Sequence, residues 1–170
     1  MNQDSGHVRR HHEGMLSAVS VGFFLILIGV LFITTPNLSD SVVKFATNFT
    51  TEQVGNTNIY IPIPQNVGNY GDVYVAVRQF SIIWGLFLIA LLGARLVFGS
   101  QVRRLAENVG DIVFWLGAAY LAQTFLVAPT QASTIDVTKW FEFWAAIIML
   151  IGVSLIARGI FLAVARLRNN

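Results

Sequence analysis

Four long apolar segments constrain this chain more than any other feature of its sequence. They cover residues 16–35, 80–98, 112–128 and 143–164. The hydrocarbon core of a membrane is about 30 Å thick, and a helix rising about 1.5 Å per residue crosses it with about 20 apolar residues. The segments are continuously apolar and do not alternate, which argues against the strands of a membrane β-barrel. The sequence therefore predicts an all-α membrane protein with four transmembrane helices.

Composition agrees with a membrane location and removes several classes of chemistry. Hydrophobic residues make up 55% of the 170 residues and charged residues only 12%, a low share for a soluble domain. Cysteine is absent, which excludes disulfides, thiolate nucleophiles and cysteine-ligated zinc or iron–sulfur clusters. The net charge of +2 is small and the arginines are scattered, so we do not expect nucleic acid as a partner.

The charged residues predict how the helices are oriented. We expect residues 1–14 to form a disordered cytoplasmic tail and residues 15–170 a single membrane domain, with an outer cap over residues 37–78. With the N-terminus inside, the positive-inside rule is satisfied, which predicts a multi-pass cell-membrane protein with both termini cytoplasmic. The inner cations are then Arg9, Arg10, Arg95, Arg103, Arg104, Arg158, Arg166 and Arg168, and the outer ones Lys44, Arg78 and Lys139.

Two arginines interrupt otherwise apolar segments close to their inner ends. Arg95 and Arg158 lie within about 6 Å of the expected inner membrane surface, so their flexible stems can carry the charge into the headgroup layer. With Arg103 and Arg166 they form candidate anchors. Alternatively, these arginines hold an anionic lipid headgroup, or they pair with Glu107 and Asp111 across a helix interface.

A weak internal repeat accompanies these arginines. Shifting the chain by 63 positions aligns Arg95 with Arg158 and Arg103 with Arg166, together with four apolar identities between positions 80 and 105. The stretches "FITTP" and "FLVAP" add a fainter match at the outer ends of the first and third segments. This pattern suggests two tandem helical hairpins of equal orientation, the first with a longer outer loop.

That longer loop predicts a small cap on the outer surface. "NLSDSVVKFATNFTTEQ" offers Ser39 or Asp40 as an N-cap and apolar residues at helical spacing, which predicts an amphipathic helix. "NIYIPIPQNVGNYGDVYVAV" predicts a possible β-hairpin with one strand over 59–64 and the other over 73–75. Packing on the chain's own helices is the favoured role of this cap, and contact with a partner is the alternative. The candidate outer interface consists of Phe45, Phe49, Tyr60, Tyr70 and Tyr74.

The third segment carries the most polar helix face. Gly117, Tyr120 and Thr124 fall on one stripe, and Gln123 borders it. Polar groups in lipid need partners, so the stripe should face other helices and mediate packing and interhelical hydrogen bonds. The functional alternative is one wall of a solute path.

The sequence provides no candidate for catalysis. HExxH, GxSxG, Walker A and GxGxxG motifs are absent, and no histidine lies in an apolar segment. His7, His11 and His12 cluster in the tail, where a metal site would lack rigid partners. We therefore predict no catalytic residues, no metal and no cofactor.

Three stretches carry a resemblance to a known group. "FWAAIIMLIGVSLIARGIFLA", "TTPNLSDSVVKF" and "DIVFWLGAAYL" resemble uncharacterised archaeal four-helix membrane proteins over most of the chain. The resemblance implies the four-helix fold, and it brings no function with it.

Two functional hypotheses follow from the sequence. The first is a non-catalytic assembly, accessory or scaffold protein that interacts with membrane lipid and with itself or a membrane partner, through its outer loop and helix faces. The second is a small transporter, channel or lipid-binding protein that uses the polar stripe or the arginines.

Overall fold

The computed structural model describes residues 4–167, with side chains described from residue 14 onward. Its long helices are α1 (Asp4–Thr34), α3 (Gly71–Val97), α4 (Val102–Leu121) and α6 (Val137–Leu167). A π-helical segment, η2 (Ala122–Val127), and the short helix α5 (Ala128–Gln131) continue α4. Four helices in the described residues are long and apolar enough to cross a membrane, which confirms the predicted fold class.

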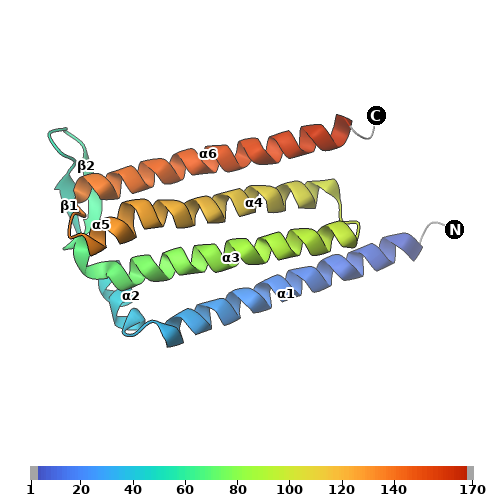
Figure 1. Ribbon diagram of the computed structural model, residues 1–170, viewed down its shortest axis with the longest axis horizontal. Helices are drawn as coiled ribbons and strands as arrows, with labels where there is room; N and C mark the ends of the chain where they lie inside the picture. The colour runs from blue at the N-terminus through green and yellow to red at the C-terminus, as the bar shows by residue number, and fades with distance from the viewer. Residues whose placement is uncertain (1–3, 168–170) are drawn as a thin grey trace.

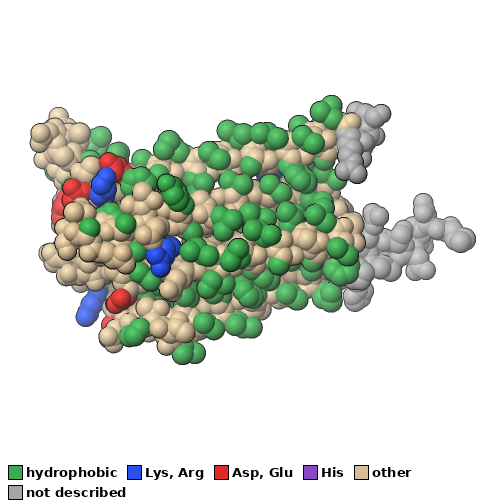
Figure 2. Space-filling view, in the orientation of Figure 1, with side chains coloured by type: hydrophobic (Ala, Val, Ile, Leu, Met, Phe, Trp, Pro, Cys, Tyr) green, Lys and Arg blue, Asp and Glu red, His purple; other side chains and the backbone are tan. Residues whose placement is uncertain are grey.

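The four long helices lie side by side in one row (Figure 1). The order across the row is α1, α3, α4, α6, and α4 packs against both α3 and α6. The start of α1 and the end of α6 lie at the same end of the helices, and the cap covers the opposite end. Figure 2 shows apolar side chains along the whole visible face of the helices, with charged side chains gathered towards the cap. This surface suits contact with lipid along the length of the helices.

Glycines allow α3, α4 and α6 to approach one another closely. A methyl group added at Gly85 of α3 would lie 2.5 Å from Leu116 Cδ2 of α4. A methyl group at Gly117 of α4 would collide with Leu150 of α6, and one at Gly110 would lie 3.2 Å from the backbone oxygen of Ser154. Membrane helices have no hydrophobic driving force between them, so small residues at such contacts gain van der Waals packing instead.

The cap contains α2 (Leu38–Thr47), β1 (Phe49–Gln53), β2 (Tyr60–Pro64) and the 3₁₀ turn η1 (Val67–Tyr70). The two strands pair antiparallel, with Phe49 opposite Pro64 and Gln53 opposite Tyr60. Both strands are edges, so the prolines of β2 remove no central ladder bond.

The expected strand boundaries were partly wrong. Of the predicted strand over 59–64, residues Tyr60–Pro64 form a strand, but their partner is Phe49–Gln53, which the sequence assigns to the amphipathic helix. Residues 73–75 belong to α3, where Val73, Tyr74 and Ala76 are buried at helical spacing. These residues are helical and not extended because, as part of α3, their buried side chains complete the core beneath the cap.

The core lies at the cap end of the helices, where the cap meets α3, η2 and α6. Ile63, Val127 and Trp140 are buried, and Trp140 Nε1 donates to the Pro62 carbonyl at 3.2 Å. The hydroxyl of buried Tyr74 donates to the Val67 carbonyl at 3.0 Å. The cap therefore packs on the chain's own helices, which was the favoured of its two predicted roles.

The helices extend beyond the apolar segments from which they were predicted. α3 begins at Gly71 and not at residue 80, and α1 begins at Asp4, inside the expected disordered tail. Residues 1–3 of that tail lie outside the described residues. Elongating an existing helix costs far less than nucleating one, so an apolar span extends into polar sequence.

Candidate functional site

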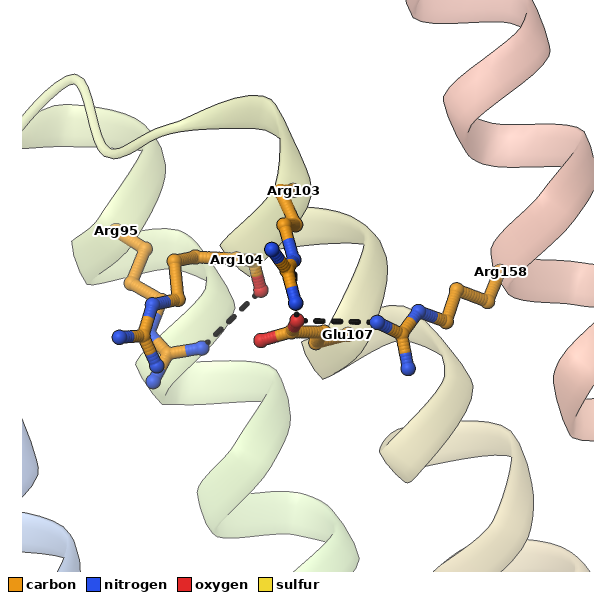
Figure 3. A network of polar contacts seen from close by, with 5 residues as sticks. All are labelled: Arg95, Arg103, Arg104, Glu107 and Arg158. Atoms are coloured by element: carbon orange, nitrogen blue, oxygen red, sulfur yellow. Dashed lines mark hydrogen bonds and ion pairs between the residues drawn. The ribbon is translucent and has the colours of Figure 1, made fainter.

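Four arginines from three helices lie near Glu107 at the end of the helices opposite the cap (Figure 3). Glu107 Oε1 accepts from Arg158 Nη2 of α6 at 3.0 Å and from Arg103 Nε at 3.1 Å. Arg95 Nη1 donates to the backbone oxygen of Arg104 at 3.2 Å. These contacts join α3, α4 and α6, and we call the five residues the arginine cluster.

A tight turn brings the α3 and α4 members of the cluster together. After α3, the Gly99 amide donates to the Leu96 carbonyl at 3.2 Å and the Ser100 amide to the Arg95 carbonyl at 2.9 Å. With Gly99 at φ +65°, this is a Schellman motif, in which the left-handed residue favours glycine. α4 then starts at Val102, so its first turn lies beside the last turn of α3.

Pairing with Glu107 was one of the alternatives offered for Arg158, and the structure contains it. The side chains are partly exposed, with 37% for Arg158 and 28% for Glu107, so water and salt screen the pair. Arg103 is 78% exposed and its contact is within one helix. Arg166 lies exposed in the last turn of α6 and is not part of the cluster.

Two further polar residues of α4 lie deeper than the cluster. Asn108 is 1% exposed, and its Nδ2 donates to the Leu88 carbonyl of α3 at 3.0 Å. Asp111 is exposed, about 10 Å further along α4 than Arg104. Arg158 and Arg95 act on its carboxylate only at longer range, because neither lies within ion-pair distance of it. Among the described residues, Asp111 has neither a hydrogen bond nor an ion pair.

The polar stripe of the third membrane segment is divided in the structure. Gly117 faces Leu150 of α6, and Gln123 accepts a hydrogen bond from Arg78 of α3. Tyr120 is 69% exposed and Thr124 is also exposed, so these two face away from the neighbouring helices. Within the described part of this chain, only Gly117 and Gln123 of the stripe face other helices, because α3 and α6 flank α4 in a row.

The candidate outer interface is divided as well. Tyr70 and Tyr74 are buried in the core, which corrects their assignment to an exposed interface. Phe45 is half-buried against them, with ring centroids 5.4 Å from Tyr70. Phe49 and Tyr60 remain exposed on the two strands. Tyr70 and Tyr74 face inward because η1 and the start of α3 lie beneath the hairpin.

Sequence reasoning missed the contact between Arg78 and Gln123. Arg78 Nη1 donates to Gln123 Oε1, and the buried Arg78 Nε has no partner. In the sequence the two residues stand apart, Arg78 as an expected outer cation and Gln123 as the border of the polar stripe. Their pairing depends on the register of α3 against the π-helical segment, which one sequence does not encode in any local pattern.

The described residues contain no group of three or more histidine, aspartate or glutamate side chains that could hold a metal ion. His7, His11 and His12 lie where side chains are not described. No family model, curated protein or solved structure matches this chain.

Proposed function

We propose that this chain is a non-catalytic integral membrane protein that assembles laterally with a second copy or with another membrane protein. The observation that carries the proposal is Asp111, which is exposed on the surface of α4 and makes no hydrogen bond or ion pair in the described chain. Arg158 and Arg95 act on its carboxylate only at longer range. An ionisable side chain within a membrane segment usually faces protein or water and pairs with another group.

The depth of Asp111 decides what can cover it. Charged and polar groups mark two levels along the helices: Arg78 and Arg95 are about 26 Å apart along α3, and Gln123 and Arg104 about 28 Å apart along α4. Both spacings approximate the thickness of the hydrocarbon core. Asp111 lies inside the inner level and has a short side chain, so it cannot extend to the headgroups as an arginine does. We therefore favour a helix of a neighbouring protein that donates a hydrogen bond to the Asp111 carboxylate.

The shape of the row is consistent with such assembly. The buried residues of α6 are Trp140, Phe143 and Ala146, all within its first turns, and the helix packs mainly on α4. Gly152 and Gly159 on this helix would meet nothing if a methyl group were added. These positions leave room for a closely approaching helix.

The test is the oligomeric state of the full chain in lipid nanodiscs. We expect the wild type to form one discrete oligomer, and Asp111→Leu to weaken its association by about tenfold or more, the scale of one lost hydrogen bond to a charged group. Asp72→Asn, at an exposed acidic residue of the first turn of α3, is the matched control and should not change it. A wild type that stays monomeric in nanodiscs and retains no partner protein would contradict the proposal.

The arginine cluster favours a second candidate, recognition of an anionic lipid headgroup. Arg103 of α4 and Arg158 of α6 both contact one glutamate, and Arg104 and Arg103 are exposed at the first turn of α4. Helix N-termini and arginines both attract phosphate. Arg103→Gln with Arg104→Gln should lower binding to vesicles that contain phosphatidylglycerol and leave binding to neutral vesicles unchanged.

The orientation belongs to the same proposal. Five described arginines lie at the end of the helices opposite the cap, and by the positive-inside rule this is the cytoplasmic side. They are Arg95, Arg103, Arg104, Arg158 and Arg166. The division of the polar stripe gives no support to a solute path within one chain, so transport is the weaker alternative.

A further inference from the structure

Arg78 carries a charge that no carboxylate of the described chain balances. It lies on α3, and its half-buried guanidinium is directed at α4, where Nη1 donates to the neutral amide oxygen of Gln123. The ion pairs in the described residues join Arg103, Arg158 and Lys139 to glutamates, and Arg78 is in none of them. Its Nε is buried without a hydrogen-bond acceptor.

Such an arrangement is costly unless an anion completes it. A guanidinium has five N–H donors, and the side chain of Gln123 occupies only one of them. A partly desolvated charge without a counter-ion costs several kcal/mol in protein environments. The neutral amide orients the guanidinium but cannot neutralise it, so we look for the balancing charge outside the described residues.

The level of Arg78 identifies the class of anion. Arg78 lies about 26 Å along α3 from Arg95, which places it at one headgroup boundary when Arg95 lies at the other. The dominant anionic group at that level is the phosphate of a phospholipid. Arginine matches a phosphate with two parallel N–H bonds, and its long stem allows it to reach this layer, unlike Asp111.

Gln123 lies in a π-helical part of the third membrane segment. It belongs to η2, in which the wider π turn changes the direction of the side chains relative to the α-helix before it. Its carbonyl oxygen meets Arg78 across the α3–α4 interface. Gln123 therefore acts as a positioning residue, which holds one edge of the guanidinium and leaves the other donors for a ligand.

We propose that Arg78, positioned by Gln123, binds a phosphate group at the outer face of the membrane, supplied by an outer-leaflet phospholipid. The proposal is independent of lateral assembly and of the arginine cluster, because its residues lie at the opposite level of the membrane. A soluble phosphate presents the same chemistry, and the experiment separates the two sources.

The test counts lipids bound to the full-length protein in detergent by native mass spectrometry. The probes are phosphatidylglycerol, the diacylglycerol with the same acyl chains, and inorganic phosphate. We expect Arg78→Gln to lose about tenfold in affinity for one phosphatidylglycerol, since a hydrogen bond between charged groups is lost. Arg78→Lys should retain most of the affinity, and Gln123→Leu should lose a smaller part. Lys44→Gln, at an exposed cation in the last turn of α2, is the matched control and should bind as the wild type does.

Each outcome has a defined meaning. Competition by millimolar inorganic phosphate supports the phosphate site with a soluble source, and resistance to it supports the lipid source. Equal retention of the diacylglycerol, or unchanged lipid binding by Arg78→Gln, would overturn the proposal. Loss of oligomer on Arg78→Gln with lipid binding intact would also overturn it, and would assign a partner's carboxylate to this position. If Arg78→Gln does not fold, Arg78→Lys and Gln123→Leu still give the comparison.

Discussion

Trp140 is the residue that fastens the cap to the membrane helices, and its removal gives a measurable prediction. Its side chain is 4% exposed, and its indole nitrogen donates to the Pro62 carbonyl of β2 at 3.2 Å. The ring packs against Phe45 and Tyr74, with centroids 6.0 and 6.4 Å away. One side chain of α6 thus touches β2, α2 and α3 together.

Two substitutions separate the hydrogen bond from the packing. Trp140→Phe keeps most of the ring and loses one neutral hydrogen bond, which contributes about 1 kcal/mol net. Trp140→Ala also removes the buried ring, which costs about 3–5 kcal/mol. Since 1.4 kcal/mol is about tenfold, opening of the cap should become about fivefold more frequent in the first variant and more than a hundredfold in the second.

Hydrogen–deuterium exchange of the β2 amides in nanodiscs measures this opening, because local opening sets the exchange rate. The matched control is Trp144→Ala, one turn along α6, where the ring is 49% exposed. It should change exchange in β2 far less than Trp140→Ala does. Equal effects of the two alanine variants, or protected β2 amides in Trp140→Ala, would refute the assignment of Trp140 as the fastening residue.

Four further predictions follow from the helix contacts. Glu107→Gln should destabilise the protein by less than about 1 kcal/mol, and by still less near about 0.5 M salt, since its ion pairs are partly exposed; thermal unfolding in detergent measures both. Gly117→Leu should separate α4 from α6 and lower the unfolding temperature, whereas Gly152→Leu should not, because only Gly117 faces a neighbour. Asn108→Leu should cost at most about 2 kcal/mol, the loss of one interhelical hydrogen bond, and Asn108→Ala should cost more because it also leaves a cavity. A cysteine placed in the turn 98–101 should react with an impermeant thiol reagent only after intact cells are permeabilised, and labelling before that would invert the proposed orientation.

The membrane helices were predictable because each depends on a local property, a long run of apolar residues. Their ends were less predictable, since polar residues such as Asp4 join a helix once the apolar part exists. The strand β1 was missed because Phe49 stands at helical spacing from Phe45, which suggested that the helix continued. Both readings are allowed locally, and pairing with β2 decides between them.

The site was predictable to the extent that charge and depth determine it. The inner arginines and Glu107 were expected at one level of the membrane, and the contact of Arg158 with Glu107 follows from that level. The hydrogen bond between Arg78 and Gln123 depends on helix register and on a π turn. The exposure of Tyr120 depends on the arrangement of helices in a row, which no single segment specifies.

The position of the hydrophobic core has a consequence for permeation. Ile63, Val127 and Trp140, from the hairpin, η2 and α6, are 0%, 2% and 4% exposed at the cap end of the helices. Together they form a tightly packed apolar layer between the cap and the helices beneath it. A hydrated ion entering from that side would have to displace the hairpin itself. Any molecule that contacts the helices is therefore expected to reach them from the bilayer and not through the cap.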